Sequence, residues 1–220
     1  MRNLLIAGAG GHGVVVADAA ELTQEWGRIH FVDDVYPKVQ RIAHWDIIGA
    51  SESLLQLGKY VDAAVVAIGN VDIRMRLIAS VEAAGIPLTS VIHPRAAVSR
   101  LARIDAGTVL LANAAVNARA KIGKGCIVNT AATVDHDCWI EDGVHIAPGA
   151  HLAADVKVGQ QTWIGAGATV REQITIGKNA VIGAGAAVVK DVADNQVVVG
   201  VPAKPIHSKT RLQVMRGSGH

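Results

Sequence analysis

The sequence predicts two architectures in one chain: a small α/β unit of the βαβαβ type at residues 1–90, and an all-β parallel solenoid at residues 91–206. Three observations predict them. Apolar runs alternate with segments of helical spacing in the first part. From residue 92, a large aliphatic residue returns at every sixth position. Aromatic residues are scarce, with one Phe, two Tyr and four Trp in 220 residues, which suits a narrow, regularly stacked interior.

The first part reads as alternating strands and helices. Gly85 and Pro87 end the second helical pattern, and the alternation argues for a small parallel sheet. The expected strands cover residues 3–7, 29–33 and 63–68, and the expected helices cover residues 12–24 and 71–84.

The second part has a strict period of six. Neither a helical face nor simple strand alternation fixes every sixth residue, so the pattern predicts a hexapeptide solenoid with three hexads in each triangular coil. The large residue should point inward, a small residue four places later should fit beneath the next coil, and the frequent glycine between them should ease the turn. The large positions are Ile92, Val98, Ile104, Leu110, Val116, Ile122, Val128, Val134, Ile140, Ile146, Leu152, Val158, Ile164, Val170, Ile176, Ile182 and Val188.

Charge and cysteine content narrow the class of protein. The net charge is +2 with no long run of either sign, so neither a nucleic acid nor an anionic membrane is an expected partner. No signal peptide and no membrane-spanning stretch is recognisable, and we expect a soluble, cytoplasmic protein. Cys126 and Cys138 fall in the small inward column, where we expect packed core thiols. Residues 207–220 are expected to be a tail, and its last five residues read as a remnant of expression.

A glycine-rich loop lies between the first strand and the first helix. Gly8, Gly10 and Gly13 fit G-x-G-x-x-G, and Asp33 follows twenty residues later, which is the dinucleotide-binding fingerprint of a Rossmann-like unit. Its glycines let backbone N–H groups approach a phosphate at a helix N-terminus. Any nucleotide would satisfy that requirement, and the unit is only half of a complete dinucleotide-binding fold. A nucleotide, NAD and a purely structural turn all stay open.

A charged turn, Asp135-His136-Asp137, interrupts the apolar hexads. His136 is the third residue of its hexad, so it should point away from the core. Three interpretations compete: a solvated turn, a metal site shared with His145 and His151, and a general base. No standard ligand spacing is present, so no metal is expected. An imidazole oriented by a neighbouring carboxylate suits removal of a proton from an attacking amine or hydroxyl.

Six motifs carry a family resemblance over residues 3–206. They are GAGGHG, FVDD, AIGN with Arg74 after it, VIHPRA, NTAATVDHDC and GVPAKPI. Together with the hexads they resemble the bacterial sugar N-acetyltransferases of the PglD/NeuD type, which are left-handed parallel β-helices. The left hand is taken from this resemblance, because it is an exception to the usual crossover.

The resemblance implies an acetyl-CoA-dependent enzyme. Its acceptor would be the 4-amino group of a nucleotide-linked 4-amino-4,6-dideoxysugar, a precursor of surface polysaccharide or glycan. In one branch the acceptor is instead a sialic acid hydroxyl, and a non-catalytic solenoid scaffold is a further alternative. Acetyl-CoA would lie in a groove between neighbouring solenoids of a homotrimer.

The resemblance also implies roles for individual residues. His136 would be the base and Asp137 its partner, where the family commonly has Glu. His145 would lie near the acetyl-CoA thioester, whereas His151 has no family role. Residues 200–206 would lie near the adenine end of acetyl-CoA, or would simply cap the last coil. The sugar-nucleotide residues implied are Gly10, Gly11, His12, Asp33, Asp34, Gly69 and Asn70, and the backbone contacts to acetyl-CoA are Ala154, Ala166 and Ala184.

Overall fold

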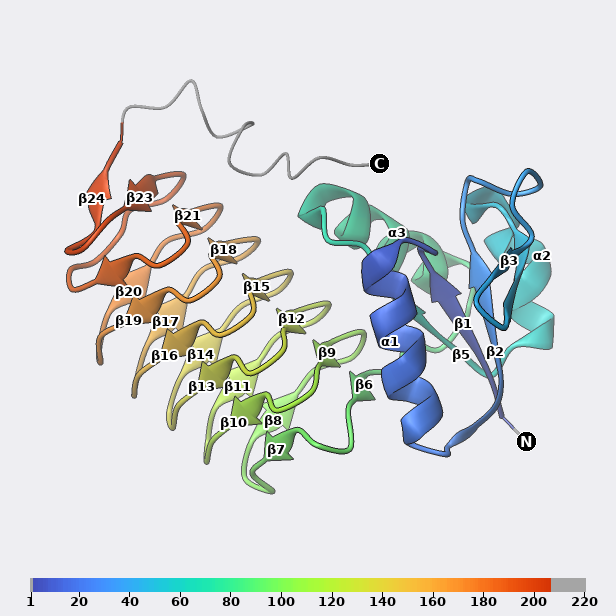
Figure 1. The fold of residues 1–220 in the computed structure, drawn as a ribbon, viewed down its shortest axis with the longest axis horizontal. Coiled ribbons are helices and arrows are strands. Elements are labelled where there is room, and N and C mark those ends of the chain that lie inside the picture. The colour runs from blue at the N-terminus through green and yellow to red at the C-terminus, as the bar shows by residue number, and fades with distance from the viewer. Residues whose placement is uncertain (1, 207–220) are drawn as a thin grey trace.

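The computed structural model describes residues 2–206 and contains both expected parts (Figure 1). An α/β unit lies beside one end of a long β-helix, and the coils advance away from it towards the C-terminal end of the described chain. The expected tail at residues 207–220 lies outside the described residues.

The α/β unit is built on a five-stranded sheet in the order β3-β4-β2-β1-β5. All neighbouring pairs are parallel except β3 with β4. The three expected strands are present with slightly different ends, while β3 and β4 were not expected, because their short apolar stretch had no clear period. The strands are β1 (Arg2–Ala7), β2 (Trp26–Val32), β3 (Arg41–Ile42), β4 (Trp45–Gly49) and β5 (Ala63–Val66).

Helices cover both faces of this sheet. Leu4 and Ile6 of β1 pack in one cluster with α1, and the alternate residues Leu5 and Ala7 pack in another with α2 and α3. This is the period of two that a strand buried on both faces requires. The helices are α1 (Gly11–Leu22), α2 (Leu54–Leu57) and α3 (Val71–Ala83), with 3₁₀ turns at Ser51–Ser53 and Gly58–Tyr60.

The second part is a left-handed parallel β-helix with three faces, and on each face the strands up to β22 stack in register eighteen residues apart. Face 1 contains β6 (Val91–Ile92), β9 (Val109–Leu110), β12 (Ile127–Val128), β15 (His145–Ile146), β18 (Trp163–Ile164), β21 (Val181–Ile182), β23 (Val197–Val199) and β24 (Lys204–Pro205). Face 2 contains β7 (Ala97–Val98), β10 (Ala115–Val116), β13 (Thr133–Val134), β16 (His151–Leu152), β19 (Thr169–Val170) and β22 (Ala187–Val188). Face 3 contains β8 (Arg103–Ile104), β11 (Lys121–Ile122), β14 (Trp139–Ile140), β17 (Lys157–Val158) and β20 (Thr175–Ile176).

The interior of the β-helix confirms the hexad prediction. The large aliphatic residues from Leu110 to Val188 form one buried cluster with the small residues of the second column. Cys126 and Cys138 are free, buried thiols in that cluster. Burial raises the pKa of Cys126 to about 12 and that of Cys138 to about 11, as expected for thiols that pack rather than react.

The role expected for the glycines that follow the large aliphatic residues was wrong. These glycines do not supply the turn; they allow coils to approach, since a Cβ on Gly165 would lie 2.6 Å from the backbone nitrogen of Ala184 in the next coil. The turn depends on the residue two places further on. From Gly107 to Gly185 that residue has φ between +53° and +73° at every corner, whether it is glycine or not.

The α/β unit packs against face 1 and its edge. Val91, Val109 and Leu111 of the β-helix share a core cluster with α1. Met75 and Ile78 of α3 lie against the turns between faces 3 and 1. In the described residues, no helix is long and apolar enough to cross a membrane.

The end of the described chain folds back on the last coil. The strand β24 pairs antiparallel with β23, and the amide of Ala203 donates to the carbonyl of Ala187. Ala203 also packs against the core cluster. This segment therefore closes the open end of the β-helix, as the capping interpretation of residues 200–206 required.

Candidate active site

The glycine-rich loop joins β1 to α1 and divides into two kinds of glycine. Gly8 has φ +110° and lies against Ala67 and Ile68, and a Cβ on Gly13 would collide with the carbonyl of Gly8. These two glycines are needed by the turn and by the close helix–strand contact. In contrast, a Cβ on Gly10 or Gly11 would meet nothing within 4 Å, so their backbone faces open space at the N-terminus of α1.

The carboxyl ends of β1, β2 and β5 meet beside this loop. Because β2 and β5 flank β1 on opposite sides, this is the switch point at which open α/β sheets bind ligands. Asp33 follows β2, and its carboxylate accepts the amides of Ala9 at 2.7 Å and Val35 at 3.0 Å. Asp34 accepts the amide of Ser51 at 3.1 Å. Both expected substrate contacts therefore also brace the loops around the switch point.

Gly69 and Asn70 lie between β5 and α3. Asn70 is the N-cap of α3, and its Oδ1 accepts the amide of Ile73 at 3.1 Å. A Cβ on Gly69 would meet nothing within 4 Å. The loop therefore leaves an open surface at Gly69 and fixes the start of the helix through Asn70.

Arg74 ties this loop to the β-helix. It is fully buried, and it donates to the carbonyls of Ile68 and Gly69 at 2.8 Å, of Gly125 at 2.9 Å and of Gly143 at 2.7 Å. Burial lowers the pKa of its guanidinium to about 10. The cation thus connects the α/β unit to two successive coils.

Two histidines lie near the buried cation of Arg74. Burial, and then the charge of Arg74, lower the pKa of His12 to about 4 and that of His145 to about 3. The Nε2 of His12 and the Nδ1 of His145 are buried without a hydrogen-bond partner in the described part of the chain. At neutral pH both rings are therefore uncharged, and each has an unused polar atom in the interface between the two parts.

The hydrogen bonds of His145 determine its tautomer. Asn129 uses Oδ1 to accept the amide of Thr130 at 2.8 Å, so its Nδ2 faces the Nε2 of His145 at 3.2 Å. An amide nitrogen can only donate, so Nε2 accepts and the ring proton is on Nδ1. The ring also packs on Trp163, with 4.1 Å between centroids. His145 therefore presents a fixed N–H donor.

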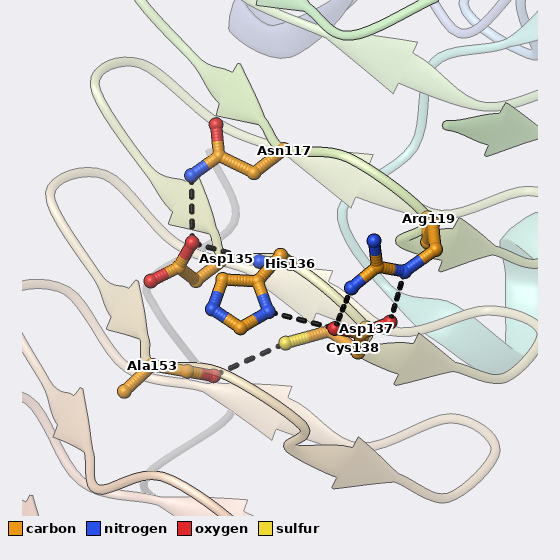
Figure 2. Close-up of polar contacts among 7 residues, drawn as sticks. All are labelled: Asn117, Arg119, Asp135, His136, Asp137, Cys138 and Ala153. Carbon is orange, nitrogen blue, oxygen red and sulfur yellow. Dashed lines mark hydrogen bonds and ion pairs between the residues drawn. The ribbon is translucent and has the colours of Figure 1, made fainter. Parts of the chain in front are cut away.

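His136 lies in the turn between β13 and β14, at the corner of faces 2 and 3 (Figure 2). Its Nδ1 is 2.7 Å from Oδ2 of Asp137. A carboxylate only accepts, so Nδ1 carries the proton and the neutral ring keeps its lone pair on Nε2. The side chain is 53% exposed, which confirms that it points away from the core.

Asp137 is held from a second side. Arg119, one coil earlier, donates from Nε to Oδ1 and from Nη2 to Oδ2, each at 2.6 Å. These bonds, and then that from His136, hold the pKa of Asp137 well below its usual range. The same pair raises the pKa of Arg119. The carboxylate therefore stays ionised beside the imidazole.

Asp135 is directed away from the ring. Its Oδ1 accepts from Nδ2 of Asn117 and from the backbone amide of His136, both at 2.7 Å. The bond from Asn117 is the main cause that lowers the pKa of Asp135. The two carboxylates beside His136 thus have different tasks, since one holds the turn and the other contacts the ring.

The structure does not bring His136 and His145 together in one chain. His145 points out of face 1 towards the α/β unit, while His136 lies at the corner opposite that face. Ala154 lies one coil after His136 in the same column of turns, whereas Ala166 and Ala184 stack at the corner of faces 1 and 2. The expected acetyl-CoA positions therefore lie along both edges of face 2.

No metal centre is recognisable in residues 2–206, where no three His, Cys, Asp or Glu side chains are placed to hold an ion. His145 and His151, which share a hexad position, project from different faces. His151 is exposed and contacts the hydroxyl of Thr133 at 2.9 Å.

Sequence reasoning missed three residues that organise the two histidines: Arg74, Arg119 and Asn129. The motif that carries the resemblance included Arg74, but its burial and its carbonyl partners gave no sequence signal. Arg119 is eighteen residues before Asp137, which is one coil. A search for opposite charges at that separation would have found this pair.

Comparisons with known proteins agree with the two parts of the chain. Residues 3–81 match the family model described as the PglD N-terminal domain, and residues 155–190 match that of the bacterial transferase hexapeptide. UDP-N-acetylbacillosamine N-acetyltransferase of Bacillus subtilis (strain 168) is 34% identical over 114 residues, which cover 51% of this chain and only about half, 52%, of that relative.

Solved structures match over nearly the whole chain. The acetyltransferase domain of PglB from Neisseria gonorrhoeae FA1090, in complex with acetyl coenzyme A, is 42% identical with a TM-score of 0.90, over 93% of this chain and 99% of that one. PerB from Caulobacter crescentus, in complex with CoA and GDP-perosamine, is 33% identical with a TM-score of 0.88, over 94% of this chain and 98% of that one. This chain therefore belongs to the PglD/NeuD-type family of hexapeptide-repeat sugar acetyltransferases.

Proposed function

We propose that this protein transfers the acetyl group of acetyl-CoA to the 4-amino group of a nucleotide-linked 4-amino-4,6-dideoxysugar, as one step in making a surface polysaccharide or glycan precursor. The relatives support an amino-sugar acceptor and CoA as co-substrate. The observation that carries the chemistry is the 2.7 Å contact between Nδ1 of His136 and Asp137.

His136 would act as the general base. Its Nε2 removes a proton from the amine while the nitrogen attacks the thioester carbonyl, and Asp137 steadies the imidazolium that forms. A carbon–nitrogen bond forms, the carbon–sulfur bond breaks, and CoA leaves as the thiolate. We propose direct transfer, and the cysteines support it: both are buried thiols with raised pKa values, which makes them poor nucleophiles for a covalent acyl intermediate.

His145 would be an electrophilic partner near the thioester. Its fixed Nδ1–H has no partner in the described residues, and a neutral ring can donate to a carbonyl oxygen that becomes negative in the transition state. Backbone amides near Ala154, Ala166 and Ala184 would add contacts to acetyl-CoA, and residues 200–206 would lie near its adenine end.

The α/β unit would hold the nucleotide. Gly10 and Gly11 expose backbone at the start of α1, where an anionic phosphate is favoured. His12 would line the pocket, and Asp33 and Asp34 would contact base or sugar in addition to bracing their loops. The open backbone of Gly69, with Asn70 beside it, would close the other side. UDP, GDP and dTDP each present the same diphosphate to this loop.

The active protein would be a homotrimer, because one chain separates the groups that the reaction needs. The His145 site faces the α/β unit, and His136 lies at the opposite corner. A sugar held by one chain could meet the base only if a neighbouring solenoid supplied its His136. In a three-fold assembly each groove has one wall from each of two chains.

The first test is an acceptor panel. We expect acetyl-CoA-dependent acetylation of at least one UDP-, GDP- or dTDP-linked 4-amino-sugar, and no acetylation of free sialic acid. If the protein instead acetylates sialic acid, the acceptor is a hydroxyl, which is a weaker nucleophile than an amine, and the proposed amino-sugar acceptor is wrong. A folded protein whose melting temperature does not respond to millimolar acetyl-CoA would favour a scaffold, since binding to the native state must raise it.

The second test is His136→Ala. We expect kcat to fall roughly 10²–10⁴-fold while the circular dichroism spectrum and melting temperature stay unchanged, because the side chain is an exposed turn residue. His151→Ala, which removes an exposed histidine next to Thr133, is the control and should retain full kcat. Wild-type kcat in folded His136→Ala would exclude the base role.

A further inference from the structure

We infer that Arg119 is a positioning residue for the base: it fixes the Asp137 carboxylate that orients His136 and limits the negative charge that this carboxylate offers to the ring. The inference rests on the proposed role of His136, since it concerns how that residue is tuned.

The first ground is the geometry of the contact. The guanidinium meets Asp137 with both prongs of its fork at 2.6 Å, and Oδ2 also accepts from Nδ1 of His136 at 2.7 Å. A two-point contact fixes the plane of a carboxylate, whereas a single bond leaves it free to rotate. Arg119 thereby decides the direction in which Oδ2 faces the imidazole (Figure 2).

The second ground is that the fold builds this contact. Arg119 and Asp137 occupy the same corner position in successive coils, with φ of +63° and +61°. The amide of Asp137 donates to the carbonyl of Ala118 at 3.2 Å, which sets the spacing of the two turns. The later members of this column are Asp155 and Gln173, so only the coil before Asp137 supplies a cation.

The third ground is that the ion pair of Arg119 and Asp137 contributes little to the stability of the fold. The side chains of Arg119 and Asp137 are 64% and 36% exposed, and exposed ion pairs contribute little to folding free energy. A role in orientation and charge therefore predicts a change in catalysis, whereas a merely structural role predicts a change in melting temperature.

The charged groups around His136 set the sign of the effect. Asp135 and Asp137 flank it in its own turn, Asp155 lies in the following coil, and Arg119 is the cation from the preceding coil; His151 projects nearby from face 2. Removing Arg119 leaves the carboxylates uncompensated. They then favour the imidazolium, so the acid limb of the rate profile should move to higher pH.

The experiment compares Arg119→Ala and Arg119→Lys with the wild type, and uses Arg103→Ala on face 3 as the control for loss of an exposed arginine. For Arg119→Ala we expect kcat/KM to fall about 10-fold and the midpoint of its acid limb to rise by about half a pH unit. Arg119→Lys keeps the charge but loses the fork, so it should restore the midpoint and leave most of the rate loss. Arg103→Ala should match the wild type.

A second readout separates this inference from the proposed function. The His136 ring can be followed by NMR through a pH titration of the free protein, with His136→Ala identifying its signal. If the NMR midpoint moves in Arg119→Ala but the kinetic limb does not, Arg119 controls the ring and His136 is not the base. If neither midpoint moves while the melting temperature falls, Arg119 is a structural residue and the inference fails.

Discussion

His145 and His136 lie in different environments, although both belong to the same hexapeptide-repeat β-helix. His145 is the outward residue of a strand on face 1, where the α/β unit and Trp163 reduce its exposure to 6%. His136 is a turn residue at a bare corner and stays exposed. The α/β unit covers face 1 and its edge at the turns between faces 3 and 1, while the corner of faces 2 and 3 lies on the opposite side of the β-helix. The fold can thus keep one histidine buried and uncharged and leave another exposed to solvent.

The two histidines also differ in what tunes them. Burial and the cation of Arg74 lower the pKa of His145, and no carboxylate is a hydrogen-bond partner of its ring in the contacts described. His136 is instead held by Asp137, which Arg119 holds in turn. The surroundings of His145 suit a hydrogen-bond donor that must stay neutral, and those of His136 suit a base.

The test with the largest expected effect asks whether the two histidines of one site come from different chains. Two differently tagged subunits, His136→Ala and His145→Ala, are co-expressed and the mixed trimers are isolated. If each site takes its two histidines from neighbouring chains, every mixed trimer has both histidines intact at one of its three sites, which is about a third of all sites. We expect kcat per site near that fraction of wild type, far above either parent.

The control for this experiment is a mixture of the two separately assembled variants without subunit exchange, which should stay as inactive as its parents. Activity of the co-expressed trimers equal to the parental average would place both histidines in one chain's site and contradict the shared groove.

The next test uses the pH dependence of stability. The pKa of His145 is lowered to about 3 from its ordinary value of 6.5, so below pH 6.5 the unfolded chain binds the proton and the native state does not. The contribution of His145 to the free energy of unfolding is therefore fully present above pH 6.5 and is lost as the pH falls towards 3. We expect His145→Gln to reduce the loss of unfolding free energy between pH 7 and pH 5 by about 2 kcal/mol.

Urea denaturation at both pH values and equal protein concentration measures this change. His12 contributes a slope of the same sign and nearly the same size between pH 7 and pH 5, because its pKa is also lowered, to about 4, and that slope should remain in the variant. The exposed His151→Gln is the matched control. An unchanged slope in His145→Gln would mean that His145 is not held neutral by burial.

The smallest test separates the two carboxylates beside His136. Asp137→Asn removes the negative charge that steadies the imidazolium, and we expect kcat/KM to fall about 10-fold or more. Asp135→Asn keeps an oxygen that can accept the His136 amide, and we expect less than a roughly 3-fold loss. Steady-state kinetics at the pH optimum measures both. Equal losses would show that the turn, rather than the ring contact, is what the reaction needs.

Sequence periodicity was sufficient for the architecture of the β-helix and for the exposure of His136. The hexads placed Val134 and Ile140 inward, Cys138 beneath the next coil and His136 outside, and the structure confirms each position. The sequence did not predict the strands β3 and β4, because these two short, partly exposed segments have too few residues to define a period.

The residues that tune the two histidines could not be predicted in the same way. Arg74 reads as an ordinary helical arginine, yet it is buried on the carbonyls of turns 51 and 69 residues away. His145 reads as a surface residue of a strand, yet the α/β unit covers it. Both facts depend on how the two parts dock, and docking leaves no local pattern in either part.

The sequence by itself determined the coil, the register and the residues that face inward or outward, because a six-residue repeat leaves each position only one direction. Only the tertiary structure decided which outward-facing residues remain exposed to solvent. It covered face 1 with the α/β unit, so that desolvation keeps His145 neutral, and it left the corner of faces 2 and 3 open, where Arg119 meets Asp137 across one coil. Those contacts join residues that are distant along the chain, and their chemistry follows from burial and proximity.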